Sequence, residues 1–250
     1  MRNIITEAVI LRKYKIGEIH KGLTIFSSDL GIINIIAHGA YKAKSRFRTA
    51  TELLSYSKFY LYRNPVNDSY KLTDIEPILR FSNIPLKIKK YFIASFWAEI
   101  ILKSHAGGSG FTETFNLFTL SMKLLDVTDE SKSDLISIQF IIRFLRLNGS
   151  MTDISRCNNC GRGIYEYEDA YYSRFSSSVF CKECKKEGYL SLPAEGRSYL
   201  KSTLKMEMEE ALKVDMKNRL IAAVKNFLYN AVENYLDSPL KSLQSGGGIL

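Results

Sequence analysis

The sequence lacks the segments that would direct a chain out of the cell or into a membrane. Residues 1–7 contain an acidic residue and no long apolar run, so we expect no signal peptide. The most apolar helix-like stretch, residues 92–102, includes Glu99 and is too short to cross a bilayer. We therefore expect a soluble, cytoplasmic protein with no membrane partner, in which free thiols bind metal and do not pair.

The sequence also lacks the usual signatures of an active site. Its three histidines, His20, His38 and His105, are scattered, and none lies beside a candidate nucleophile. No Gly-x-x-x-x-Gly-Lys-Ser/Thr loop is present to hold a nucleotide phosphate. The acids among the first strands show no spacing that would gather several of them at a metal-dependent nuclease site. We therefore expect no catalytic residues and a protein that is not an enzyme.

Cysteine is scarce, but all of it is concentrated in one motif. Two Cys-x-x-Cys pairs are separated by twenty residues, which leaves room for a short hairpin, and their members are Cys157, Cys160, Cys181 and Cys184. This spacing is typical of a tetrahedral zinc site, and four cysteines fill the coordination sphere of a structural Zn²⁺. Two alternatives are a pair of disulfides, which suits a secreted chain, and a redox pair, which needs only one such motif.

The charge is strongly positive and unevenly distributed. The net charge is +9, and residues 1–80 hold 13 Lys or Arg against 7 Asp or Glu. A basic chain without a membrane segment points to nucleic acid or another polyanion. The alternative is a basic protein whose charge only keeps it soluble.

The pattern of apolar residues changes its period near residue 80. Five short segments before it are rich in β-branched and aromatic residues: 4–14, 23–27, 32–37, 58–63 and 70–76, the last closed by Pro77. Five strands with a longer connection between the third and fourth predict a small closed barrel of the OB-fold type over residues 1–80.

The rest of the chain has helical periodicity. Helices are expected over 86–104, 111–125, 134–147, a short stretch after Pro193, and a long one that Asp215 caps and that ends near 236. Asn148-Gly149 should end the third of them. The predicted class is α+β, an N-terminal five-stranded OB-fold barrel followed by a helical domain, 81–250, with a Cys₄ zinc finger inserted at about 154–190.

No acidic residue occurs between Asp29 and Glu52, a window that includes most of the connection between the third and fourth strands. If extended, this connection would set Lys42, Lys44, Arg46 and Arg48 along one edge, where they could follow phosphates, with Tyr41 and Phe47 as faces for stacking bases. The alternative is a solvated loop whose aromatic residues fold onto the barrel. Arg12, Lys13 and Lys21 are expected to extend the DNA-binding patch more weakly.

Several stretches, taken in order, resemble the RecO family of bacterial recombination mediators. They are residues 7–14, Gly17-Glu18, 24–31, 38–47, the cysteine module and 235–242. Tyr41 stands where that family more often has a basic residue, so the resemblance carries over Lys42, Lys44, Arg46 and Arg48 as DNA contacts.

The resemblance implies a function in DNA repair and homologous recombination. RecO-like proteins bind single- and double-stranded DNA and anneal complementary strands in the cytoplasm, at the nucleoid. They also engage the acidic C-terminal tail of single-stranded DNA-binding protein (SSB) and work with RecR to load RecA, which they contact indirectly. The alternative function is that of another OB-fold zinc protein, a scaffold that binds RNA or acidic protein tails.

Overall fold

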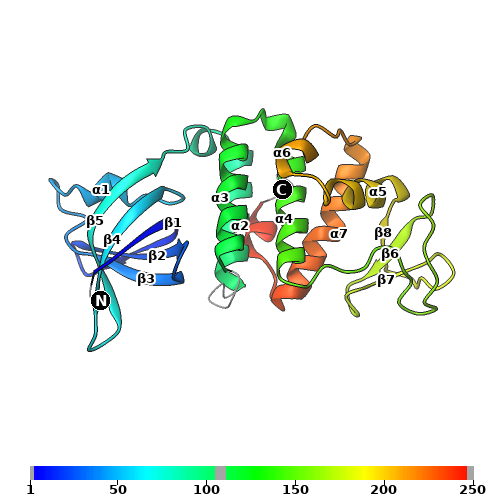
Figure 1. Ribbon diagram of the computed structural model, residues 1–250, viewed down its shortest axis with the longest axis horizontal. Helices are drawn as coiled ribbons and strands as arrows, with labels where there is room; N and C mark the ends of the chain where they lie inside the picture. Colours follow the sequence, from blue (N-terminus) through cyan, green and yellow to red (C-terminus); the bar gives the residue numbers. More distant parts are fainter. Residues whose placement is uncertain (1–2, 105–110, 247–250) are drawn as a thin grey trace. The chain divides into compact units, whose positions relative to one another are not determined.

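The computed structural model describes residues 3–104 and 111–246, so His105 lies outside the described residues (Figure 1). The chain divides into two compact units, Met1–Asp126 and Val127–Leu250, and each is described by itself. This division differs from the boundary near residue 80 that the change of period indicates. The end of the last barrel strand at Leu79 agrees with that boundary, but two helices also belong to the first unit.

The first unit contains the closed five-stranded barrel that the sequence predicts. Its strands are β1 (Asn3–Ile16), β2 (His20–Ser27), β3 (Gly31–Ala37), β4 (Tyr56–Asn64) and β5 (Ser69–Leu79). Their order is β1-β2-β3-β5-β4, and β4 pairs with β1 to close the barrel. The β3–β5 pair is parallel and short, with Ile35 opposite Tyr70 and Ile36 opposite Lys71, and all other neighbours are antiparallel.

Alternating apolar residues fill the barrel. Ile10, Leu23, Ile25, Ile35 and Phe59 are wholly buried in one cluster. The prediction that Pro77 closes the last strand was wrong, because β5 continues to Leu79. Pro77 lies opposite Ser57, beside an irregularity in the β4–β5 register, where a residue without an N–H does not interrupt a regular ladder.

Two helices complete the first unit, α2 (Ile88–Lys103) and α3 (Phe111–Val127). Phe115 of α3 contacts two barrel rings edge to face, with centroids 5.4 Å from Phe26 and 6.0 Å from Tyr56. The buried carboxylate of Asp126 accepts the backbone N–H groups of residues 82–84, which tie the segment after β5 to the end of α3. These contacts explain why the compact unit extends beyond the barrel.

The second unit combines helices with a small sheet. Its main helices are α4 (Ser133–Leu147), α5 (Ala194–Thr203) and α7 (Asn218–Leu236), with the short α6 (Met208–Ala211) and α8 (Lys241–Ser245). The sheet has the order β7-β6-β8, built from β6 (Ala170–Ser173), β7 (Ser178–Phe180) and β8 (Leu190–Leu192). The β6–β7 pair is the hairpin expected between the two cysteine pairs.

The ends of two helices test the capping predictions. Gly149 adopts a left-handed conformation, with φ 65°, directly after α4, as predicted. Asp215 does not cap α7, which begins at Asn218, and its carboxylate forms an ion pair with Lys132 instead. Within the described part of the chain, a search for helices of membrane-spanning length and hydropathy finds none.

Candidate nucleic-acid interface and cysteine cluster

Residues 38–52, the greater part of the connection between β3 and β4, are called the basic segment below. It is not extended as the alternating pattern suggested, since it consists of turns followed by the short helix α1 (Phe47–Ala50). Lys42 accordingly folds back, and its backbone N–H donates to the carbonyl of Gly39 at 3.1 Å. The cations therefore lie on a turn and a helical turn instead of along one straight edge.

All four cations of the basic segment are exposed to solvent, and three of them have no side-chain partner among the described residues. Lys42, Lys44 and Arg48 make no side-chain hydrogen bond or ion pair with any described residue. Tyr41 is 40% exposed. Phe47 is partly buried against the barrel core, so its ring is less available for stacking than expected.

Arg46 is held against the barrel. Its guanidinium donates to the backbone carbonyl of Thr73 at 2.9 Å and lies 3.1 Å from a carboxylate oxygen of Asp74. The same group lies 5.1 Å from the centroid of the Phe47 ring. Its charge is thus partly neutralised by β5, although the side chain remains 64% exposed.

Lys21 is buried, which removes it from the surface patch in which the sequence placed it. Its side chain is 2% exposed, and its ammonium donates to the backbone carbonyls of Arg48 and Thr51, both at 3.3 Å. The ammonium also lies 3.4 Å from Glu52 and 5.2 Å from the centroid of the Tyr41 ring. Lys21 therefore anchors the basic segment from inside, and a phosphate cannot reach it without moving that segment.

Arg12 and Lys13 lie on β1 beside the segment. Lys13 forms an ion pair with Glu52, while Arg12 is exposed and has no charged partner among the described residues. Partial burial acts to raise the pKa of Glu52, but the ammonium groups of Lys13 and Lys21 outweigh it and hold that pKa below its ordinary value. Glu52 thus forms ion pairs with these two lysines, and Lys42, Lys44, Arg48 and Arg12 have no acidic partner among the described residues.

His38, the first residue of the basic segment, contacts His20 of β2, and the sequence alone did not predict this contact. The rings of His20 and His38 are 4.8 Å apart and edge to face, and His20 Nδ1 accepts the backbone N–H of Gly39 at 3.0 Å. Burial, then the neighbouring His20 and Lys71, lower the pKa of His38. The two histidines are eighteen positions apart, so only the β2–β3 pairing brings them together.

The four predicted metal ligands do come together. The sulfurs of Cys157, Cys160, Cys181 and Cys184 all lie within 4.8 Å of one another. Sulfurs around a tetrahedral Zn²⁺ at about 2.3 Å are roughly 3.8 Å apart, and the Sγ atoms of Cys160 and Cys181 are separated by 4.0 Å. The arrangement therefore fits a closed four-thiolate metal site.

Backbone turns shape each cysteine pair. The N–H of Gly161, at φ 73°, donates to the carbonyl of Cys157 at 2.9 Å, and the N–H of Lys185 donates to that of Cys181 at 3.0 Å. Burial acts to raise the pKa of the Cys157 thiol, but nearby backbone N–H groups outweigh it and lower the value to about 6. Such N–H groups favour the thiolate form that a metal requires.

Arg197 supports the cysteine cluster from α5. It is 2% exposed, and its guanidinium donates to four backbone carbonyls, those of Ile154 at 2.9 Å, Ile164 and Tyr165 at 3.0 Å, and Glu168 at 2.5 Å. These carbonyls flank the first cysteine pair on both sides. A buried cation therefore holds the backbone on both sides of the first cysteine pair.

Family models match nearly the whole chain. The model for the recombination protein O N-terminal domain matches residues 1–81, and that for its C-terminal domain matches residues 85–244. The chain belongs to the RecO family. Its N-terminal barrel is accordingly the OB-fold of that family, and a role in DNA repair and recombination follows from membership.

Several curated relatives carry the name DNA repair protein RecO. The one from Acetivibrio thermocellus is 27% identical over 184 residues, which cover 74% of this chain and 71% of the relative. That from Desulfitobacterium hafniense is 26% identical over 76% of this chain and 67% of the relative. One from Dehalococcoides mccartyi is 29% identical over 72% of this chain and 69% of the relative.

Proposed function

We propose that this RecO-family chain is a recombination mediator that binds single- and double-stranded DNA through the exposed cations of its basic segment. The observation that carries the proposal is that Lys42, Lys44 and Arg48 are exposed and uncompensated among the described residues. Lysine and arginine bind phosphates by releasing condensed counterions, which does not depend on base sequence. Arg12 adds a fourth exposed cation on β1, and Arg46 a partly compensated one.

The same cations can promote annealing without covalent chemistry. Two complementary strands repel each other through their phosphates, and base pairing supplies the driving force once that repulsion is reduced. A cationic surface that holds one strand while the second approaches therefore accelerates annealing. Annealing of this kind needs no catalytic residue, which is consistent with a chain that is not an enzyme.

Family membership supports two protein partners, RecR and the acidic C-terminal tail of single-stranded DNA-binding protein, and through them the loading of RecA. An acidic tail would be attracted by the same positive field that attracts DNA. In this account the protein works at the nucleoid, where all of these partners meet DNA.

The cysteine cluster is proposed to hold one structural Zn²⁺. Thiolates of all four cysteines would complete the coordination sphere, so the metal would stabilise the fold and would have no open position for a substrate. Its contribution would be to keep the two cysteine pairs together at the end of the β6–β7 hairpin.

The test is strand binding and annealing by the variant Lys42→Ala/Lys44→Ala/Arg48→Ala. We expect it to bind single strands of every sequence more weakly and to anneal complementary strands more slowly. Arg63→Ala is a matched control, because Arg63 is an exposed barrel arginine already paired with Asp68. Unchanged affinity and annealing in the triple variant would refute the proposal, and a preference for structured RNA over DNA in competition would favour the RNA-binding alternative.

A further inference from the structure

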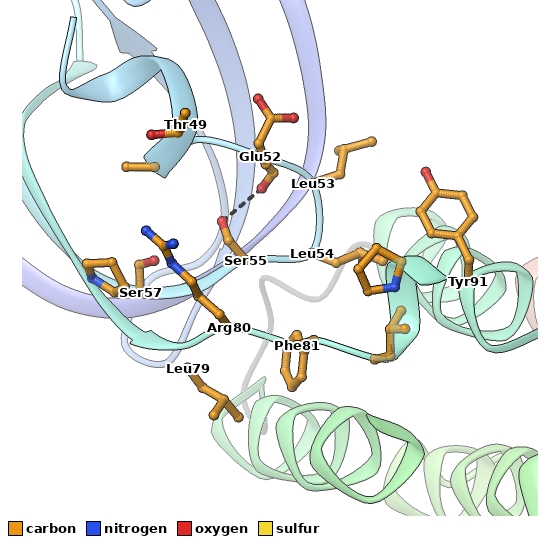
Figure 2. Close-up of a pocket in the computed structure, with 14 residues that line it drawn as sticks. Thr49, Glu52, Leu53, Leu54, Ser55, Ser57, Leu79, Arg80, Phe81 and Tyr91 are labelled. Carbon is orange, nitrogen blue, oxygen red and sulfur yellow. Dashed lines mark hydrogen bonds between the residues drawn. The ribbon is translucent and has the colours of Figure 1, made fainter. Parts of the chain in front are cut away.

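We propose that a hollow beside the basic segment receives one unstacked base of a bound single strand. The hollow measures about 260 Å³ and lies within the first unit, between the α1–β4 connection, the end of β5 and the start of α2 (Figure 2). This inference rests on the proposed DNA binding and adds a specific site to it.

The hollow is continuous with the basic segment. Thr49 and Ala50 of α1 line it, and they follow Arg48 directly in the chain. A strand whose phosphates contact Arg48 would lie beside the residues that form this wall of the hollow. This continuity is what links the hollow to a nucleic acid.

The walls of the hollow suit a flat, weakly polar group. Its inner surface includes Leu54, which is 7% exposed, and Ile84, which is 1% exposed. Two aromatic residues also line it, Phe81 from the segment after β5 and Tyr91 from α2 (Figure 2). Aromatic rings bind unstacked bases of any sequence, because every base has a π-face.

The hollow also carries an unused cation. Arg80 lines it and makes no hydrogen bond or ion pair with any described residue. Its guanidinium extends from the end of β5 toward the side of the hollow formed by α1 and Thr49 (Figure 2). The one carboxylate in the lining, Glu52, already pairs with Lys13 and Lys21, so an incoming anion meets net positive charge.

These features favour a nucleotide over an apolar peptide. A peptide side chain would use the apolar walls, but it would leave Arg80 and the exposed cations Lys42, Lys44 and Arg48 without a partner. A single strand presents a base and a phosphate at every step, and so matches the apolar walls and the adjoining cations together.

The experiment compares two single strands of equal length and charge, oligothymidine and an abasic strand. Phosphate contacts are common to both, so the ratio of their affinities isolates the contribution of the bases. The wild type should prefer oligothymidine, and Tyr91→Ala should reduce that preference by roughly 5- to 100-fold if the ring stacks on a base. The affinity of Tyr91→Ala for the abasic strand should stay unchanged.

Three further variants keep the test independent of folding. Tyr91→Phe retains the ring and should retain the preference. Tyr14→Ala is a matched control, because Tyr14 is 40% exposed, as Tyr91 is, but does not line the hollow. Arg80→Ala removes an exposed side chain and should weaken both strands to a similar degree, as expected for a phosphate contact.

The inference is overturned if Tyr91→Ala leaves the preference for oligothymidine unchanged, or if it weakens both strands equally. It is also overturned if an apolar, acid-ended peptide occupies the hollow while DNA binding is unaffected, which would make it a protein-docking site. Failure of the proposed function gives a different result, namely that the Lys42/Lys44/Arg48 variant binds both strands as the wild type does.

Discussion

Two buried cations each hold one irregular segment of this protein, and the number of their contacts differs. Lys21 in the barrel and Arg197 in the second unit are each 2% exposed, and each donates to backbone carbonyls of a segment without regular structure. Lys21 contacts two carbonyls and a carboxylate, whereas Arg197 contacts four carbonyls. The segment at Arg197 also contains the cysteine cluster, which the proposed metal would hold together, while the basic segment contains no cysteine.

This difference in how the segments are held matches the role proposed for each of them. With the proposed metal bound, the cysteine segment would be held by both Arg197 and the metal, which is appropriate to a structural site. The basic segment is anchored at its end by Lys21 and tied to the barrel by the ion pairs of Arg46 and Glu52, and Lys42 and Lys44 lie outside these contacts, as the proposed phosphate binding requires. Four variants test this comparison, from the largest expected effect to the smallest.

Loss of the metal should have the largest effect. Structural zinc contributes about 10–16 kcal/mol in small modules that fold around it, and we expect a smaller but still substantial loss here because Arg197 supports the same segment. Cys184→Ser should abolish stoichiometric zinc and lower the thermal midpoint of unfolding. The measurement is metal analysis in reducing buffer with thermal unfolding, and Ser191→Ala, an exposed residue of β8, is the control. A reduced wild type that contains no metal would contradict the assignment.

Arg197→Met should have the second-largest effect on stability. Methionine fills similar space but leaves four backbone carbonyls, two of them in buried hydrogen bonds, without their donor, at a cost of about 3 kcal/mol in the free energy of unfolding. Urea unfolding measures this, and Arg174→Met is the control because Arg174 is exposed in the same module. A loss no larger than that of the control would mean that the cysteines alone hold the segment.

Lys21→Met should destabilise the barrel by ~1–3 kcal/mol, because the carbonyls of Arg48 and Thr51 lose their donor. DNA binding should weaken because the segment is less ordered, while the dependence of affinity on salt stays as in the wild type. Lys15→Met serves as the control, since Lys15 lies opposite Lys21 in the β1–β2 pair but is exposed. A reduced salt dependence would instead make Lys21 a phosphate contact.

The pH dependence of stability that arises from Glu52 should be the smallest of the four effects. Its pKa in the folded protein lies below the ordinary 4.5, so its ion pairs stabilise the fold above about that pH and are lost as the pH falls through the folded value. The effect is small because the side chain is 52% exposed. Glu52→Gln should therefore lose less stability than the wild type between neutral pH and about pH 3, measured by urea midpoints. Parallel acid sensitivity in the two proteins would contradict this.

The barrel and the cysteine cluster could be predicted from sequence because local patterns specify them. Strand alternation gave five strands in the correct order along the chain, and two Cys-x-x-Cys turns gave the four ligands. Each of these patterns is read within a few neighbouring residues. The overall division into a barrel and a helical part followed from the same local signals.

The roles of individual basic residues could not be predicted, because they depend on pairing between distant segments. The sequence predicts Lys21 as a surface charge, but in the structure residues 48–52 cover its ammonium group. Arg46 looked as available as Lys44, but the strand that neutralises it begins more than twenty residues later. The alternation in residues 42–48 resembled a strand and in fact belongs to turns and one helical turn.

The most direct test of the central claim is the salt dependence of single-strand binding by Lys42→Ala/Lys44→Ala/Arg48→Ala. Each lost phosphate contact should reduce the slope of log affinity against log salt by about 0.7, so the triple variant should lose about 2 in slope relative to the wild type. Lys21→Met, measured beside it, should keep the wild-type slope. A triple variant with the wild-type slope would contradict the claim that these three cations form the DNA interface.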